Sequence, residues 1–309
     1  MSDIAFCHQA LLYDGVAQYR DGVASFVRDG LRAGEAVLVA VLDDKVELLR
    51  DELGRDADQV RFLDMAVVGR NPARIIPAWR DWVAEHDSRR PFRGVGEPVW
   101  PGRSPAELVE CHQHESLLNL AFGGLPVWRL LCPYDMAALD KNVIDIAVAN
   151  HPVVDDRANA DYRPPALVGF LTEPLPDARE PIVEFPFGSS DLAALRDAVG
   201  QQAGKTGLNA DAGDDLMLAA HEAAANSIDH GGGSGLLRMW QDGDHFVCDV
   251  LDTGLIMDPF VGRHRPNPHQ ARGRGLWMAN QLCDLVQVRS SAEFGTIVRL
   301  RVSIRPQSG

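Results

Sequence analysis

The segment HEAAANSIDHGGG, residues 221–233, places a carboxylate and a carboxamide four positions apart and then ends in a run of glycines. On a helix, residues four apart lie on the same face, so Glu222 and Asn226 would present their side-chain oxygens side by side. Such a pair can hold a hard cation and orient a water or hydroxyl nucleophile. Mg²⁺ suits it because that ion takes few protein ligands and keeps waters and phosphate oxygens. Alone, the pair also fits an ordinary exposed helix face.

A second motif, LDTG at 251–254, ends a predicted strand. The Asp252 carboxylate can accept a hydrogen bond from an exocyclic amine, and Gly254 allows a planar base to approach the backbone closely. Taken separately, the motif would be no more than a turn.

A third motif, RGRGLW at 272–277, puts two glycines directly before a predicted helix. Gly273 and Gly275 would offer free backbone amides at the positive end of a helix dipole, where a phosphate group binds. Arg272 or Arg274 could pair with a terminal phosphate, although an arginine in a loop is usually only solvated. The three motifs in this order indicate a nucleotide site.

Residues 183–304 resemble the GHKL, or Bergerat-fold, ATP-binding domain. HEAAANSIDHG is similar to its N box, DTG to its first glycine box, GRGL to its second and GTIVRL at 295–300 to its final strands. After Gly254, where the family usually has another glycine, this chain reads LIMDP. The compact length, with a short lid and no preceding dimerisation helices, is similar to the anti-sigma-factor serine kinases of the RsbW and SpoIIAB type.

This resemblance implies ATP and Mg²⁺ as cofactors. It assigns Glu222 as the general base that acts on a protein serine and Asn226 as the magnesium ligand. It assigns adenine recognition to Asp252, supported by Thr296, and phosphate binding to the glycine loop. The residues expected to contact the nucleotide are Asn226, Asp252, Gly254, Gly273, Arg274, Gly275 and Thr296.

Two different arrangements of predicted elements surround these motifs. In the second half, helices are grouped apart from hairpin strands, which predicts a two-layer α+β fold. In the first half, strands and helices alternate, which predicts an α/β fold with a parallel sheet in three layers, RecA-like but without a P-loop because no GxxxxGK[ST] is present. The predicted helices are 16–33, 44–53, 73–86, 105–121, 137–150, 191–204, 214–230 and 275–284; the predicted strands are 5–13, 36–42, 60–64, 92–98, 127–134, 183–187, 236–241 and 246–252, with a final strand pair after them.

A proline-rich segment separates the two halves. Seven of the 19 prolines fall between residues 152 and 186, which favours an extended linker with one short strand at LVGFL and a boundary near 175–182. The expected organisation is a sensory domain at 1–152, a linker at 153–182 and an ATPase domain at 183–309.

The first half has its own conspicuous stretches. GRNPARIIPAW (69–79), GVGEPVWPGRSPAELVECHQHESLLN (94–119) and LLCPYD (130–135) resemble the MEDS sensory domain, over about residues 5–152. This resemblance implies a domain that senses a small-molecule signal. The pairing of the two domains resembles the anti-sigma regulators of the RsbA type.

Glu97 and Glu115 are the sensory candidates, since the GEP sequence ends a strand at the carboxyl edge where α/β proteins bind ligands. A metal or haem site is a competing interpretation for several neighbouring side chains. Their spacing fits no zinc pattern well, and buried cysteines and hydrogen-bonded histidines are ordinary, so we favour core residues. The side chains in question are Cys111, His112, His114, Glu115, Cys132 and His151.

Composition limits the classes of partner. The net charge of −14 and the pI of about 5.1 argue against direct nucleic-acid binding, which needs a basic patch. Five scattered cysteines without CxxC spacing make a disulfide framework improbable. The start lacks the pattern of a signal peptide, and no apolar run is long enough to span a membrane, so we expect a cytoplasmic protein without a membrane partner.

The expected function is that of an anti-sigma-type regulator, a protein serine/threonine kinase that acts on a STAS-domain anti-anti-sigma partner and thereby controls a sigma factor. A homodimer is possible. One alternative is a non-catalytic switch that uses nucleotide binding only to choose between partners. A sensor histidine kinase is a further alternative, but His221 points to a different helix face from the N box, and no phosphoacceptor helix precedes the ATPase domain.

Overall fold

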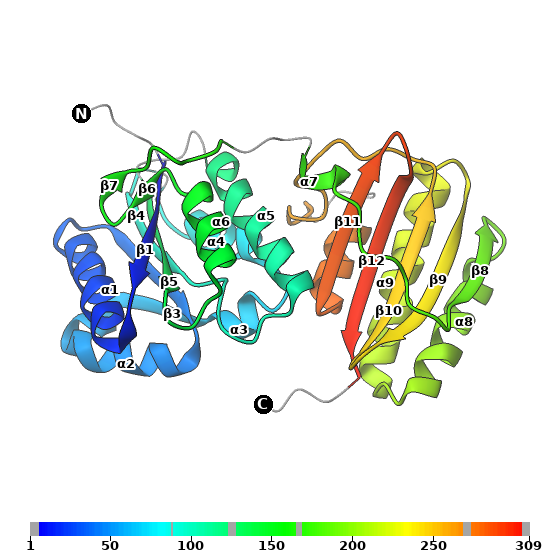
Figure 1. The fold of residues 1–309 in the computed structure, drawn as a ribbon, viewed down its shortest axis with the longest axis horizontal. Coiled ribbons are helices and arrows are strands. Elements are labelled where there is room, and N and C mark those ends of the chain that lie inside the picture. The colour runs from blue at the N-terminus through cyan, green and yellow to red at the C-terminus, as the bar shows by residue number, and fades with distance from the viewer. Residues whose placement is uncertain (1–5, 88, 123–127, 165–168, 268–272, 305–309) are drawn as a thin grey trace. The chain divides into compact units, whose positions relative to one another are not determined.

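The computed structural model describes residues 6–87, 89–122, 128–164, 169–267 and 273–304. The chain forms two compact units, Met1–Pro165 and Ala166–Gly309 (Figure 1). Within the described residues, no helix has the length and apolar character that crossing a membrane requires.

The first unit is built on a mostly parallel sheet with the strand order β3-β2-β4-β5-β1-β6-β7, in which only β7 is antiparallel to its neighbour. Every residue of β2 is buried, as expected for a parallel strand covered on both faces. The strands are β1 (Phe6–Tyr13), β2 (Ala36–Val41), β3 (Val60–Asp64), β4 (Phe92–Gly96), β5 (Trp128–Asp135), β6 (Val153–Val154) and β7 (Arg157–Ala158).

Helices cover both faces of this sheet, which confirms the predicted three-layer α/β class (Figure 1). On one face, α1 (Gly15–Arg32) and α2 (Asp43–Leu53) pack on alternate residues of the central strands, including Val39 and Leu131. On the other face, Leu130 and Trp79 lie so close to Gly94 of β4 that a Cβ there would be 2.9 Å from Leu130 and 3.1 Å from Trp79 and would displace them. The helical segments on this side include α3 (Met65–Val68), α4 (Ile75–Ala84), α5 (Pro105–Ala121) and α6 (Lys141–Asn150), and the 3₁₀ turns are η1 (Gly54–Gln59) and η2 (Pro72–Arg74).

The segment expected to be a linker takes part in both units. Val153 and Val154 pair with β1, and a tight turn at Asp155 and Asp156, both at positive φ, returns the chain as β7. Where a short strand was predicted at LVGFL, the described residues instead form the helix α7 (Gly169–Thr172), which packs against the sheet of the second unit. Arg299 of that sheet donates to the carbonyl of Pro176 at 2.9 Å. The division of the chain therefore precedes the predicted boundary.

The second unit is a two-layer α+β sandwich, again as predicted. Its antiparallel sheet has the order β11-β12-β10-β9-β8, and three helices lie on one face. The elements are β8 (Val183–Gly188), α8 (Leu192–Thr206), α9 (Ala210–His230), β9 (Ser234–Asp242), β10 (His245–Asp252), α10 (Gly275–Leu282), β11 (Leu285–Ser291) and β12 (Gly295–Ser303).

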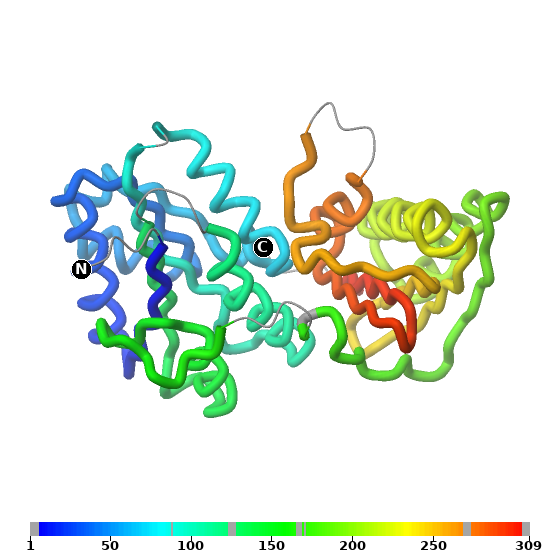
Figure 2. The backbone as a smooth tube through the Cα atoms, turned by 90° about the horizontal axis from the view of Figure 1, so that it is seen from above, coloured from blue at the N-terminus to red at the C-terminus, as the bar shows by residue number. Residues whose placement is uncertain are grey.

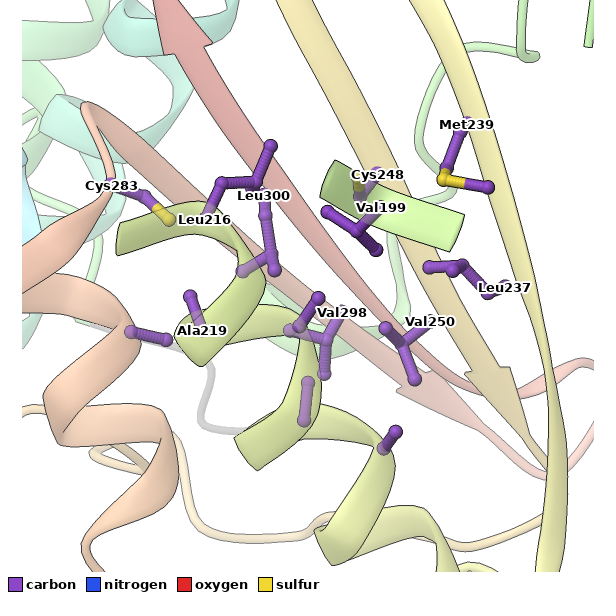
Figure 3. Packing of buried hydrophobic residues seen from close by; sticks show 14 of the residues in the cluster. Val199, Leu216, Ala219, Leu237, Met239, Cys248, Val250, Cys283, Val298 and Leu300 are labelled. Atoms are coloured by element: carbon purple, nitrogen blue, oxygen red, sulfur yellow. The ribbon is translucent and has the colours of Figure 1, made fainter. Parts of the chain in front are cut away.

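The core of this unit lies between α9 and the sheet (Figure 3). Leu216 and Ala219 of α9 point toward Val250, Val298 and Leu300 of the strands, and all five side chains are buried. Alanine on the inner face of the helix lets its backbone approach the sheet closely. The packing of α9 therefore fixes where its outer residues, Glu222 among them, can lie.

A pair of leucine substitutions tests this packing. We expect Leu300→Ala, at a fully buried position, to lower the free energy of unfolding of the second unit by about 2–5 kcal/mol, because it leaves a cavity under α9. Leu218→Ala, at a position 39% exposed, should lower it by about 1 kcal/mol at most. Hydrogen exchange of the β9–β12 amides, followed by mass spectrometry in increasing urea, measures the stability of this unit independently of the other unit. Equal effects of the two substitutions would contradict the packing.

Candidate functional site

A cavity of about 240 Å³ opens in the second unit, between the C-terminal half of α9, the end of β10, the start of α10 and β12. In Figure 2 the segment that follows β10 is the orange tube beside α10. The walls are largely apolar, with a few polar groups. The lining residues are Ala223, Asn226, His230, Gly231, Asp252, Gly254, Leu255, Ile256, Val261, Gly262, Gly273, Leu276, Thr296 and Val298.

Glu222 and Asn226 lie together against the first residue of α10. A Cβ atom at Gly275 would be 2.9 Å from Asn226 Nδ2 and 3.0 Å from Glu222 Oε2. Both side chains therefore contact the backbone at the positive end of this helix, where a larger residue would displace them. Among the described residues, none forms a hydrogen bond or an ion pair with the Glu222 carboxylate. The carboxylate is thus available to accept a proton.

Asp252 is held in place at the end of β10. One carboxylate oxygen accepts from the Ser227 hydroxyl at 2.5 Å, and the other accepts from the Gly254 amide at 2.7 Å. A Cβ at Gly231 would be 2.3–2.6 Å from the carboxylate, so α9 must end in a glycine here. A carboxylate has about four acceptor positions, and these two bonds leave others for a donor in the cavity.

Thr296 supports the same loop from β12. Its hydroxyl donates to the carbonyl of Gly254 at 3.0 Å and lies 2.8 Å from the Ser290 hydroxyl. Ser290 in turn accepts from the Ile256 amide at 2.9 Å. The two hydroxyls therefore fix the loop 252–256, whose apolar residues form one wall of the cavity.

The glycine loop lies at the opposite end of the cavity. Gly273 lines it with φ +81°, which favours glycine. Arg274 is exposed and donates to the carbonyl of Asn267 at 3.5 Å. Arg272 lies outside the described residues. Free amides at the start of α10 can bind an anion, and the apolar walls with the Asp252 acceptor suit a planar base.

Sequence reasoning did not select Ser227, Gly231 and Ser290, which hold Asp252 and Thr296 in place or leave room for them. Ser290 pairs with Thr296 in the hairpin register, so the β11–β12 pairing was the signal that could have found it. Ser227 belongs to the same helix as Asn226, but its bond to Asp252 spans 25 residues and has no local signature.

In the first unit, Glu97 follows β4 at the carboxyl edge of the sheet and is almost fully buried. Its carboxylate pairs with the Lys45 ammonium, which also donates to the Tyr13 hydroxyl at 2.9 Å. Burial raises the pKa of Glu97 to about 7, and Lys45 opposes this shift. The carboxyl group therefore titrates at near-neutral pH.

Glu115 occupies a different place. It is fully buried on α5, 3.0 Å from His8 Nε2 and 3.2 Å from His151 Nε2. Burial alone would raise the pKa of Glu115, but these histidines bring it well below the usual value. His8 lies on the face of β1 opposite to Tyr13, the neighbour of Glu97. The structure thus does not bring Glu97 and Glu115 into one site.

The potential metal ligands named from the sequence do not all lie at one place either. Cys132 and His151 gather at Glu115, together with His8, which sequence reasoning did not select. Cys111 instead donates to the carbonyl of Pro98 at 3.2 Å. Contacts between β1 and α5 span more than 100 residues of sequence, so the spacing of motifs could not show this cluster.

Comparisons with known families agree with the division of the chain into two units. Residues 7–152 match the family described as MEDS, the methanogen/methylotroph, DcmR sensory domain, and residues 185–302 match the histidine kinase-like ATPase domain. A similar solved structure is that of the RsbU and RsbW domains of Rv1364c from Mycobacterium tuberculosis, at 19% identity and a TM-score of 0.32, over 42% of this chain and 34% of that chain. This chain thus matches only about a third of that chain's length. No curated protein matches significantly.

The pairing of Glu97 with Lys45 can be tested by measuring the pKa of the Glu97 carboxyl group. We expect the Glu97 carboxyl group to lose its proton at about pH 7. Lys45→Met should move this titration to higher pH, because it removes the positive charge that lowers the pKa of Glu97. The raised pKa means that protonated Glu97 contributes stability at low pH, which is lost as the pH rises from about 4.5 to about 7.

Carbon-13 NMR of glutamate carboxyl groups measures this titration, and Glu97→Gln assigns the resonance. Lys141→Met is the control, since Lys141 pairs with Asp145 at the surface. A Glu97 carboxyl that titrates near pH 4.5 in the wild type would contradict the expectation.

Proposed function

Starting from a chain that joins a MEDS sensory domain to a histidine kinase-like ATPase domain, we propose that the second domain transfers the γ-phosphoryl group of ATP to a serine or threonine hydroxyl of a STAS-domain anti-anti-sigma protein. The transfer controls the availability of a sigma factor, in the cytoplasm, in response to a small-molecule signal at the MEDS domain. The observation that carries the proposal is the joint position of Glu222 and Asn226 against Gly275, beside the cavity that Asp252 closes.

Adenine fits the end of the cavity that Asp252 and Thr296 form. The carboxylate accepts the exocyclic amine, while Ser227 and Gly254 hold its orientation. Ile256, Val261 and Leu276 line the cavity and can pack against the faces of the base. Holding the acceptor rigid limits the entropy that is lost on binding.

The phosphates fit the end formed by Gly273, Gly275 and the first amides of α10, where Arg274 lies at the surface. Asn226 would hold Mg²⁺ through its side-chain oxygen, a hard ligand of the kind this ion prefers. When bound, Mg²⁺ neutralises the negative charge that phosphoryl transfer concentrates on the phosphates.

Glu222 acts on the acceptor hydroxyl. As the oxygen of the serine or threonine forms its bond to the γ-phosphorus, its proton passes to the Glu222 carboxylate, and the bond between the γ-phosphorus and the bridging oxygen breaks to release ADP. Most of the rate enhancement in phosphoryl transfer comes from positioning and charge stabilisation. Loss of the base therefore slows transfer without preventing nucleotide binding.

A phosphorylation assay with a purified STAS-domain protein tests the proposal. We expect Glu222→Gln to slow transfer of phosphate from labelled ATP by about 10²–10⁴-fold while Mg-ATP binding persists. Glu293→Gln, at an exposed position in the β11–β12 turn, should leave the rate unchanged. The phosphorylated product should be stable in acid, as phosphoserine and phosphothreonine are.

Three outcomes would contradict parts of the proposal. Equal rates for the wild type and Glu222→Gln would exclude Glu222 as the base. ATP binding without any transfer would favour a non-catalytic partner switch. An acid-labile product would indicate a phosphohistidine.

A further inference from the structure

A second cluster of reactive side chains lies in the first unit, outside the nucleotide site. His8 comes from β1, Cys132 from β5, Glu115 from α5 and His151 from the residue after α6. Each offers one ligand atom, and the four atoms all lie within 4.8 Å of one another. His8 and Cys132 share a face of the sheet, because the parallel register of β1 and β5 places Ala10, two residues after His8, opposite Cys132.

The separations between these atoms suit a tetrahedral centre. His8 Nε2 is 3.0 Å from Glu115 Oε2 and 3.3 Å from Cys132 Sγ, and His151 Nε2 is 3.2 Å from Glu115 Oε2. In a tetrahedral zinc site with ordinary bond lengths, neighbouring ligand atoms are about 3.3–3.6 Å apart. These three distances are within a few tenths of an ångström of that range, and the remaining pairs of ligand atoms lie within 4.8 Å of each other.

The outer ring nitrogens of both histidines are already engaged. His151 Nδ1 lies 2.7 Å from the carbonyl oxygen of Ala147, which can only accept, so Nδ1 carries the hydrogen. His8 Nδ1 lies 3.1 Å from Asn119 Oδ1, and the amide nitrogen of Asn119 donates to the carbonyl of Asn150 at 2.9 Å. With a hydrogen on each Nδ1, both Nε2 atoms carry a lone pair, and each lies within 3.2 Å of Glu115 Oε2. This arrangement is typical of metal-binding histidines.

Several polar atoms at the centre of the cluster are unsatisfied. Among the described residues, both carboxylate oxygens of Glu115 and Nε2 of His151 are buried without a hydrogen-bond partner. Lone pairs that converge in a buried space require a cation or a proton between them.

We propose that His8, Glu115, Cys132 and His151 bind one divalent transition-metal ion, zinc by the nature of the donors, in a closed four-coordinate site. Two imidazole nitrogens, one thiolate and one carboxylate are ligands that zinc accepts, whereas Mg²⁺ and Ca²⁺ prefer oxygen alone. As the metal–sulfur bond forms, the Cys132 thiol releases its proton to solvent. The dication, thiolate and carboxylate together are then neutral, which suits a fully buried site.

Four protein ligands leave no open coordination position, so the site is structural rather than hydrolytic. It ties β1 and β5 to α5 and to the end of α6. The MEDS domain would thus have a metal-loaded state in which these elements are held together. This inference does not depend on the proposed kinase function, because it concerns the other unit.

Cobalt substitution in the full-length chain tests the site. After removal of metal with a chelator, Co²⁺ alone is titrated while the absorption spectrum is recorded, and Zn²⁺ is titrated by calorimetry. We expect one equivalent to bind, with the intense visible bands of tetrahedral cobalt and a near-ultraviolet thiolate-to-cobalt band. Co²⁺ bound by oxygen ligands at Asn226 would give neither signal.

Variants assign the ligands. Cys132→Ser should abolish the thiolate band and weaken binding by more than about 100-fold, beyond the loss typical of substitutions outside the ligand set. Cys111→Ser is the matched control, since Cys111 is equally buried in the same unit but bonds to Pro98. Zinc should also raise the melting temperature of the wild type and not that of Cys132→Ser.

The cobalt spectrum of the wild-type chain tests the proposed metal site even if a variant fails to fold. A folded wild-type chain that binds neither Co²⁺ nor Zn²⁺, or that binds Co²⁺ without a thiolate band, would overturn the proposal. Retention of the band in Cys132→Ser would overturn it as well.

Discussion

The close approach of helix α9 to the start of helix α10 is the constraint on which the candidate nucleotide site depends. Only a glycine at Gly275 leaves space for Glu222 and Asn226 against the first turn of α10. A carboxylate and a carboxamide thereby lie beside the positive end of a helix dipole, and the carboxamide of Asn226 lines a cavity of about 240 Å³. A larger residue at this position would separate the parts of the site.

The same requirement for close contact recurs at the other end of the cavity. Gly231 ends α9 against the Asp252 carboxylate, and Gly254 approaches the backbone of Gly231 and His230. Hydroxyl groups of Ser227, Ser290 and Thr296 then fix the loop by hydrogen bonds. The sheet and the alanine face of α9 supply the rigidity that the polar groups need. A site built on packed elements holds its geometry more precisely than one built on loops alone.

Local patterns predicted the fold class and the two families because their signals lie within short segments. The alternation of buried strands with helices, and the motifs at 221–233, 251–254 and 272–277, are each contained in one or two elements. Ser227 and Ser290 were missed since their hydrogen bonds join elements that the motifs do not connect. Glu115, Cys132 and His151 were considered as metal ligands from the sequence and set aside, and His8 was not selected, because His8 and Cys132 meet only through the pairing of β1 with β5.

The proline-rich segment shows a different limit. Proline density predicts an extended chain, but it does not show what that chain packs against. Val153 and Val154 extend the first sheet, and the carbonyl of Pro176 is held by Arg299 of the second. The roles of Glu222, Asn226, Asp252 and the glycine loop remain predictions, because their positions fit a nucleotide but the chemistry is still to be measured.

Calorimetric titration of the full-length chain with Mg-ATP tests the central claim most directly. We expect binding at one site, weakened at least about tenfold by Asp252→Asn, because the amide cannot replace the carboxylate at both Ser227 and the adenine amine. Asp229→Asn, at an exposed position near the end of helix α9, should bind like the wild type. A folded wild-type chain that does not bind Mg-ATP, or equal affinities for all three proteins, would contradict the assignment of the cavity.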